Sequence, residues 1–148
     1  MQDKEYKYRE WKSAEEMHEE SMRWLSELAF IQDEITFLED LLEKHFSKLT
    51  TAKFYENSKE LTTELGEMRA IAESVEQKVK KHNNELDILL DGIDQPHEER
   101  EVKADHRWFI QCTNAFFHDF KQVKRSVFTV ILDIMKDEKR NKLLRSPE

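Results

Sequence analysis

The chain repeats apolar residues at alternating steps of three and four positions along three separate stretches. Such spacing places the apolar side chains on one face of a helix, as in helices that pack into bundles. The first stretch comprises Ala14, Met17, Trp24, Leu28, Ile31, Ile35, Leu38, Leu42 and Leu49, with Ser21 and His45 at its two polar positions. The second comprises Leu61, Leu65, Met68, Ala72, Val75, Val79, His82, Leu86 and Leu89. The third comprises Val102, His106, Phe109, Thr113, Phe116, Phe120, Val123, Val127, Val130 and Ile134.

The start of the first helix has a clear sequence signal. Ser13 is followed three residues later by Glu16, which is the spacing of a capping box that satisfies two backbone N–H groups at a helix start. We therefore predict a first helix over 13–49. An N-terminal extension over 1–12, partly ordered or helical, precedes it.

The start of the second helix has two interpretations. Thr51 can cap it, or Asn57 can cap it, with Glu60 at the capping-box spacing. In both cases we predict that this helix ends at Asp91, because Gly92 can adopt the left-handed conformation that closes a helix.

The third helix is predicted to begin at Pro96, since proline suits the first helical position. It should run to residue 140, and a frayed tail over 141–148 should follow. Three helices of comparable length joined by short loops pack up, down and up. The sequence therefore predicts an all-α fold, an antiparallel three-helix bundle over 13–140 with long coiled-coil-like helices.

Composition and charge support this fold and narrow the classes of function. Two glycines and two prolines in 148 residues leave little material for the tight turns of a many-stranded sheet. The formal net charge of −8 repels phosphate backbones and anionic lipids, so we expect neither nucleic acid nor a membrane as a partner. The single cysteine, Cys112, and the lack of an apolar N-terminal export signal indicate a cytoplasmic protein.

The first and third helices carry more large apolar residues than a three-helix core requires. Beside their core positions stand Phe30, Phe37, Leu41, Ile110, Phe117, Phe128, Ile131 and Met135. Exposed apolar stripes usually mark an interface, so we predict self-association through them, most simply as a homodimer. A heterologous protein partner is the other candidate. Alternatively, the N-terminal segment with Tyr6, Tyr8 and Trp11 covers these residues.

Three of the six histidines, His45, His82 and His106, occupy core positions. Because the turn between the second and third helices is short, residues whose numbers sum to about 187 should lie level, which pairs His82 with Asp105 and His106. If the second helix starts at Thr51, the same reasoning places His18 opposite about residue 83. Three histidines from three helices would then share one layer.

A layer of this kind has the ligand chemistry of a zinc or iron site. Its candidate ligands are His18, His82, His106, Glu15, Glu85 and Asp105. A start at Asn57 would instead move His18 roughly 10 Å away from His82. We therefore expect the core histidines to hydrogen-bond carboxylates such as Glu85 or Asp105, with the metal site as the alternative.

The sequence lacks the motifs of common catalytic sites. It contains no Gly-rich phosphate loop, nucleophile elbow or HExxH sequence. We therefore expect no catalytic residue and no cofactor, and predict an interaction or scaffold protein that self-associates. A metal-binding protein is the second interpretation. A third, an acidic mimic of nucleic acid, lacks a patterned carboxylate face to support it.

Overall fold

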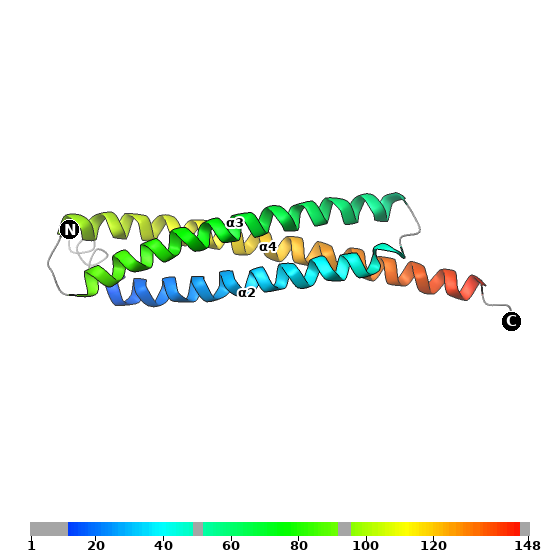
Figure 1. Cartoon of the computed structure of the whole chain (residues 1–148), viewed down its shortest axis with the longest axis horizontal. Helices are drawn as coiled ribbons and strands as arrows, with labels where there is room; N and C mark the ends of the chain where they lie inside the picture. Colours follow the sequence, from blue (N-terminus) through cyan, green and yellow to red (C-terminus); the bar gives the residue numbers. More distant parts are fainter. Residues whose placement is uncertain (1–11, 49–51, 92–95, 146–148) are drawn as a thin grey trace, which may run out of the picture. The chain divides into compact units, whose positions relative to one another are not determined.

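The computed structural model describes residues 12–48, 52–91 and 96–145. These residues form three helices, α2 (Ala14–Phe46), α3 (Ala52–Leu90) and α4 (Pro96–Arg145), and none of the residues in these ranges lies in a strand (Figure 1). The protein is therefore an all-α three-helix bundle, as the sequence predicts. No helix in the described part of the chain is sufficiently long and apolar to span a membrane.

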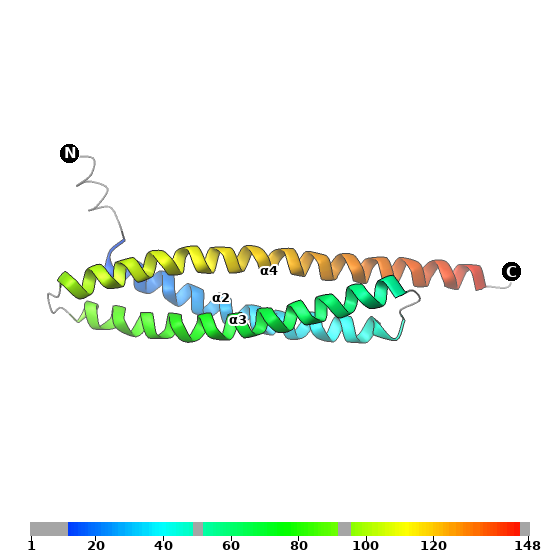
Figure 2. The same ribbon diagram turned by 90° about the horizontal axis from the view of Figure 1, so that it is seen from above.

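The chain divides into two compact units, and each helix contributes a segment to both. Unit 1 consists of Met1–Ala29 and Glu73–Asn114, and unit 2 consists of Phe30–Ala72 and Ala115–Glu148. Within each unit, α2 and α4 run in the same direction and α3 runs against them (Figure 2). Each unit is thus a three-helix bundle with its own packed interior.

The helix boundaries follow local chemistry. The backbone N–H of Glu16 donates to Ser13 Oγ at 3.2 Å, which confirms the predicted cap of α2. α3 begins at Ala52, as expected for the earlier of its two predicted starts, although Thr51 itself lies outside the described residues. α4 extends past the predicted end at residue 140 to Arg145, where basic side chains in the last turn favour the helix C-terminus.

Most of the predicted core positions that the structure describes are buried, and Ala14, Leu89, Val123 and Val130 are half-buried. The ten that we expect to be most central are Leu28, Ile35, Leu38, Leu65, Val75, Val79, Phe109, Phe116, Phe120 and Val127, and all ten are buried. On α4, the predicted division between core and interface is wrong near the C-terminal end. Ile131, assigned above to the interface, is buried, whereas Val130, assigned to the core, is half-buried. Because both residues are apolar and a helix has 3.6 residues per turn, the spacing pattern does not distinguish a step of three from a step of four at this point.

Gly66 is the only glycine within α3, and glycine has a low helix propensity. It is exposed, and a Cβ atom built on it would meet nothing within 4 Å among the described residues. We therefore expect Gly66→Ala to raise the free energy of unfolding by about 0.5–1 kcal/mol, because alanine loses less backbone entropy in a helix. Urea denaturation monitored by circular dichroism measures this change, and a destabilised variant would contradict the expectation.

Candidate functional site

A hydrogen-bonded chain of three side chains crosses the core of unit 1. Glu20 Oε1 on α2 lies 2.8 Å from His106 Nε2 on α4. His106 Nδ1 in turn lies 2.8 Å from His82 Nε2 on α3. Both histidines are buried, at 0% exposure for His106 and 2% for His82. A carboxylate and two imidazoles therefore connect all three helices of the unit.

Aromatic rings hold the two imidazoles in place. The Trp24 ring stacks on the His106 ring, with centroids 4.8 Å apart and an interplanar angle of 26°. The Phe109 ring lies 4.9 Å from the His82 ring. A second polar contact lies beside this chain, where Ser21 Oγ donates to Asn83 Oδ1 at 2.9 Å. Ser21, His82 and His106, which are polar core positions on three helices of unit 1, thus gather into one layer.

The protonation states follow from the geometry. Burial raises the pKa of Glu20, but the hydrogen bonds from His106 and Lys12 and the charges of these two residues outweigh burial. The net effect lowers the pKa of Glu20, so this carboxyl group is ionised at neutral pH. Burial lowers the pKa of His106, and the hydrogen bond to Glu20 opposes part of that shift. Burial, together with the charge of His106, lowers the pKa of His82 to about 4. Both imidazoles are therefore neutral at pH 7.

Neutral imidazoles allow one arrangement of protons along the hydrogen bonds that join Glu20, His106 and His82. The ionised Glu20 accepts from the Nε2–H of His106, which leaves His106 Nδ1 as an acceptor. His82 then donates to it from Nε2–H, so His82 Nδ1 carries a lone pair. That nitrogen is buried and has no hydrogen-bond partner among the described residues. The chain of hydrogen bonds ends at this atom.

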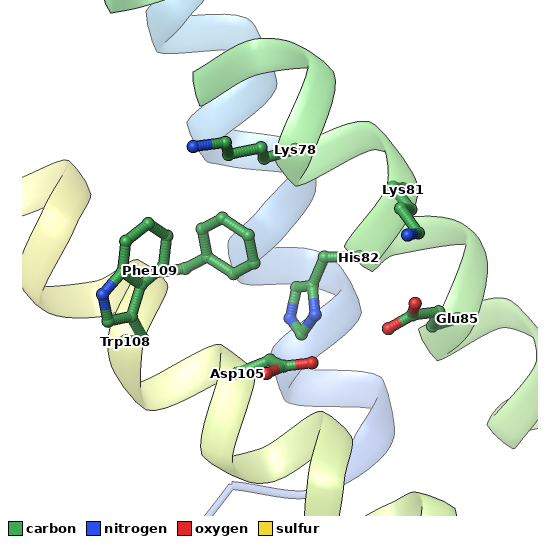
Figure 3. A pocket seen from close by; sticks show the side chains of 7 residues that line it. All are labelled: Lys78, Lys81, His82, Glu85, Asp105, Trp108 and Phe109. Atoms are coloured by element: carbon green, nitrogen blue, oxygen red, sulfur yellow. The ribbon is translucent and has the colours of Figure 1, made fainter. Parts of the chain in front are cut away.

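His82 lines an open pocket of about 260 Å³ between α3 and α4 of unit 1. Figure 3 shows Trp108 and Lys78 toward one end of this pocket and Glu85 and Asp105 toward the other, with His82 between them. Lys78 Nζ lies 5.8 Å from the centroid of the Trp108 ring, a cation–π contact. Because Nδ1 of His82 is shielded from solvent, a substrate would not reach it without movement of neighbouring side chains. The arrangement therefore favours a structural polar layer over a catalytic base.

The structure brings together two of the three histidines of the predicted layer. His82 and His106 pair as the sequence predicts. His18 instead pairs with Asp87 Oδ1 at 2.8 Å, and Glu15 is exposed. Ser21, not His18, occupies the α2 position opposite residue 83. The register between α2 and α3 thus differs from the predicted one by about one helical turn.

The other predicted ligands also differ in their surroundings. Glu85 and Asp105 line the pocket beside His82, but the carboxylate that bonds a core histidine is Glu20, which the sequence analysis did not single out. His45 is buried, and its Nδ1 has no partner within the described ranges. Among the described residues, no group of three or more His, Cys, Asp or Glu side chains is arranged to hold a metal ion.

Unit 2 carries an apolar surface along the contact between α2 and α4. We define the α2–α4 apolar surface as Phe30, Phe37, Phe128, Leu132 and Met135, whose exposed fractions range from 38% to 64%. An ion pair between Glu34 and Lys124 marks the junction of the two helices. Phe30 and Phe37 lie four residues before and three after Glu34, and Phe128 lies four after Lys124. One-turn spacings place all three on the flanks of this junction.

The remaining predicted interface residues are less accessible. Leu41 and Phe117 are half-buried within unit 2, and Ile110 is half-buried in unit 1. Leu132 was missed, although its position four residues after Phe128 and three before Met135 extends the same stripe. Tyr6, Tyr8 and Trp11, the alternative cover for this surface, lie outside the described residues.

Comparisons of this chain with protein-family models, curated proteins and solved structures give no match.

Proposed function

We propose that this protein is a non-enzymatic interaction or scaffold protein that forms a homodimer through the α2–α4 apolar surface of unit 2. The observation that carries the proposal is the concentration of five large apolar side chains, each between 38% and 64% exposed, on the two flanks of one helix junction. A concentration of exposed apolar side chains of this kind is uncommon on soluble monomers, and the protein is stabilised when a partner removes them from water.

A second copy fits this surface because its two flanks complement each other. In the ion pairs Glu34–Lys124 and Lys48–Glu138, the two residue numbers differ by the same amount. Residues of α2 and α4 whose numbers differ by about that amount therefore lie level, and Phe37 and Phe128 nearly meet this condition. A two-fold axis parallel to the helices sets α2 of one copy against α4 of the other and preserves these levels. Phe37 of each copy then lies opposite Phe128 of the other.

The charges beside the apolar surface support the same arrangement. Asp33 and Asp40 are exposed on α2, each three residues after one of the two phenylalanines. Lys121 and Arg125 are exposed on α4, seven and three residues before Phe128. When α2 faces α4 of a second copy, this acidic edge meets a basic edge at both sides of the interface. Complementary rim charges fix orientation and register more than they add affinity.

The amount of apolar area is consistent with a moderate interface. Five side chains that are about half exposed contribute roughly 500 Å² per copy, and the flanking polar residues would raise this toward the roughly 800 Å² per partner of a standard interface. We expect the aromatic residues near the centre to dominate the binding free energy.

The dimer can be tested by light scattering at micromolar concentration in about 0.5 M salt, where contacts between exposed charges are screened. We expect twice the chain mass of 17.9 kDa. Phe37→Glu should reduce this to the monomer mass, because assembly would bury an unpaired charge. Phe46→Glu is the matched control: Phe46 is 46% exposed on α2 but contacts Tyr55 of α3, so the dimer should persist. A monomeric wild-type chain would refute the proposal.

We further propose a cytoplasmic location and no role in binding nucleic acid. The support is the net charge of −8 and the single cysteine, Cys112, which is half-buried. The metal-binding alternative gains no support from the geometry, because His18 lies apart from the paired histidines and bonds Asp87.

A further inference from the structure

We infer that copies of this chain also associate head to tail, with the C-terminal end of α4 of one copy docking into an acidic groove on unit 1 of another. The two surfaces are distinct from the α2–α4 apolar surface, so this inference does not depend on the proposed dimer.

The groove lies between α3 and α4 and has a volume of about 340 Å³. Its apolar lining consists of Ile88, Leu89 and Val102, of which Ile88 is 57% exposed. Four carboxylate side chains complete the lining, namely Glu85, Glu98, Glu101 and Asp105. A groove lined by apolar and acidic side chains is complementary to an apolar segment that carries several cations.

The C-terminal end of α4 is such a segment. Leu143 and Leu144 are 69% and 78% exposed, the two highest exposures among the large apolar residues that the structure describes. Four cationic side chains accompany them within two turns, and all are exposed: Lys139, Arg140, Lys142 and Arg145. Within unit 2, α4 continues past the end of α2 (Figure 2), and Lys48, two residues after that end, pairs with Glu138. This end of α4 therefore projects as a single helix.

A second copy is the occupant that the composition of the two surfaces favours. The groove presents four carboxylates around apolar residues, and the α4 end presents four cations around two leucines. The opposite local charges create an attraction despite the like net charge of −8 on each copy. Because groove and α4 end are different surfaces, the contact is heterologous. It therefore produces assemblies that extend beyond a pair unless the geometry closes a ring.

The test uses full-length chains that carry Phe37→Glu, so that the α2–α4 apolar surface does not contribute. Sedimentation velocity at about 0.05 M salt should show a weight-average mass that rises with protein concentration, and about 0.5 M salt should suppress this rise by screening. Cancelling the charge of the α4 end (Lys139→Glu with Lys142→Glu) or of the groove (Glu98→Lys with Glu101→Lys) should shift the association to at least about tenfold higher concentration.

Mixing the two altered variants provides the decisive result. In an equimolar mixture, the unaltered groove of one variant meets the unaltered α4 end of the other, so pairs should form at the concentrations at which the parent chain associates. A variant that had merely lost its fold would not be restored by mixing. Matched charge reversals at exposed positions elsewhere on α3 (Lys53→Glu with Lys59→Glu, and Glu64→Lys with Glu67→Lys) should leave association unchanged. A parent chain that stays monomeric at low salt, or a mixture that stays monomeric, would overturn the inference. The occupant of the groove would then have to be a different molecule.

Discussion

Replacing Leu65 by alanine is expected to lower the free energy of unfolding by about 2–5 kcal/mol, because the change removes a large buried group and leaves a cavity. Leu65 has 0% exposure in the interior of unit 2. Phe120, on α4 of the same unit, is 3% exposed, and Phe120→Ala should have a loss in the same range or slightly above it. Both losses would be a large fraction of the stability of an ordinary domain.

Neighbouring positions supply the controls for this prediction. Gly66→Ala, at the next residue of α3, should change stability in the opposite direction, as argued above. Leu144→Ala makes the same chemical change as Leu65→Ala at a side chain that is 78% exposed, and should cost less than about 0.5 kcal/mol. Urea denaturation of all variants at one protein concentration compares them directly. A loss below about 1 kcal/mol for Leu65→Ala would place this side chain outside the core.

The fold was predictable because each helix of this chain carries a complete and nearly regular apolar face. The pattern failed at one place on α4, where Val130 and Ile131 are both apolar and either can continue the face. The structure buries Ile131. Periodicity identifies which face of a helix is buried, but it does not decide between adjacent apolar residues where the step changes.

The histidine pair was predictable for a similar reason, since α3 and α4 are joined by a short connection that fixes their register. The connection between α2 and α3 is equally short in the structure, but the sequence left its end open between Thr51 and Asn57, and the predicted layer placed His18 where Ser21 lies. A better signal was present in the sequence. Ser21, His82 and His106 are polar residues at core positions of three different helices, and matching polar positions to one another gives the observed register.

Glu20 was harder to identify because it lies beside a core position and not on it. Glutamate is abundant on every exposed face of this chain, so its type gave no signal. Its role depends on the distance from α2 to His106, which periodicity does not provide. The half-buried Phe117 and Leu41 illustrate the same limit for the interface, since flank positions are exposed or covered according to how closely two helices approach.

Acidification from pH 7 to pH 4 is expected to destabilise the protein, and the buried His82 should account for about 2–3 kcal/mol of the loss. The pKa values of His82 and His106 are lowered in the folded state, to about 4 for His82. Between their ordinary value of 6.5 and these lowered values, the unfolded chain binds protons that the folded chain does not. The stability that the neutral histidines contribute is therefore fully present above pH 6.5 and is lost as the pH decreases toward 4.

The charged groups around the pair do not remove this effect. Lys12 pairs with Glu20 at 3.3 Å on the α2 side and disfavours a second cation nearby. On the α3 and α4 side, Lys78 and Lys81 share the pocket of His82 with Glu85 and Asp105, so cations and carboxylates balance in number. Protonation of both imidazoles would also direct two N–H groups at each other where His106 now accepts from His82.

Variants of single histidines isolate the contribution of this pair. His82→Gln retains an N–H donor for His106 Nδ1 but removes one titrating ring, so the loss of stability between pH 6.5 and 5 should be smaller than in the wild-type chain. Ordinary carboxylates titrate near pH 4, which keeps this window specific to the histidines. His118→Gln is the exposed control on α4, where His118 contacts Gln122, and it should leave the pH dependence unchanged. Urea denaturation across this range measures the slope. An identical slope for His82→Gln and the wild-type chain would show that the buried pair is not what couples protons to folding.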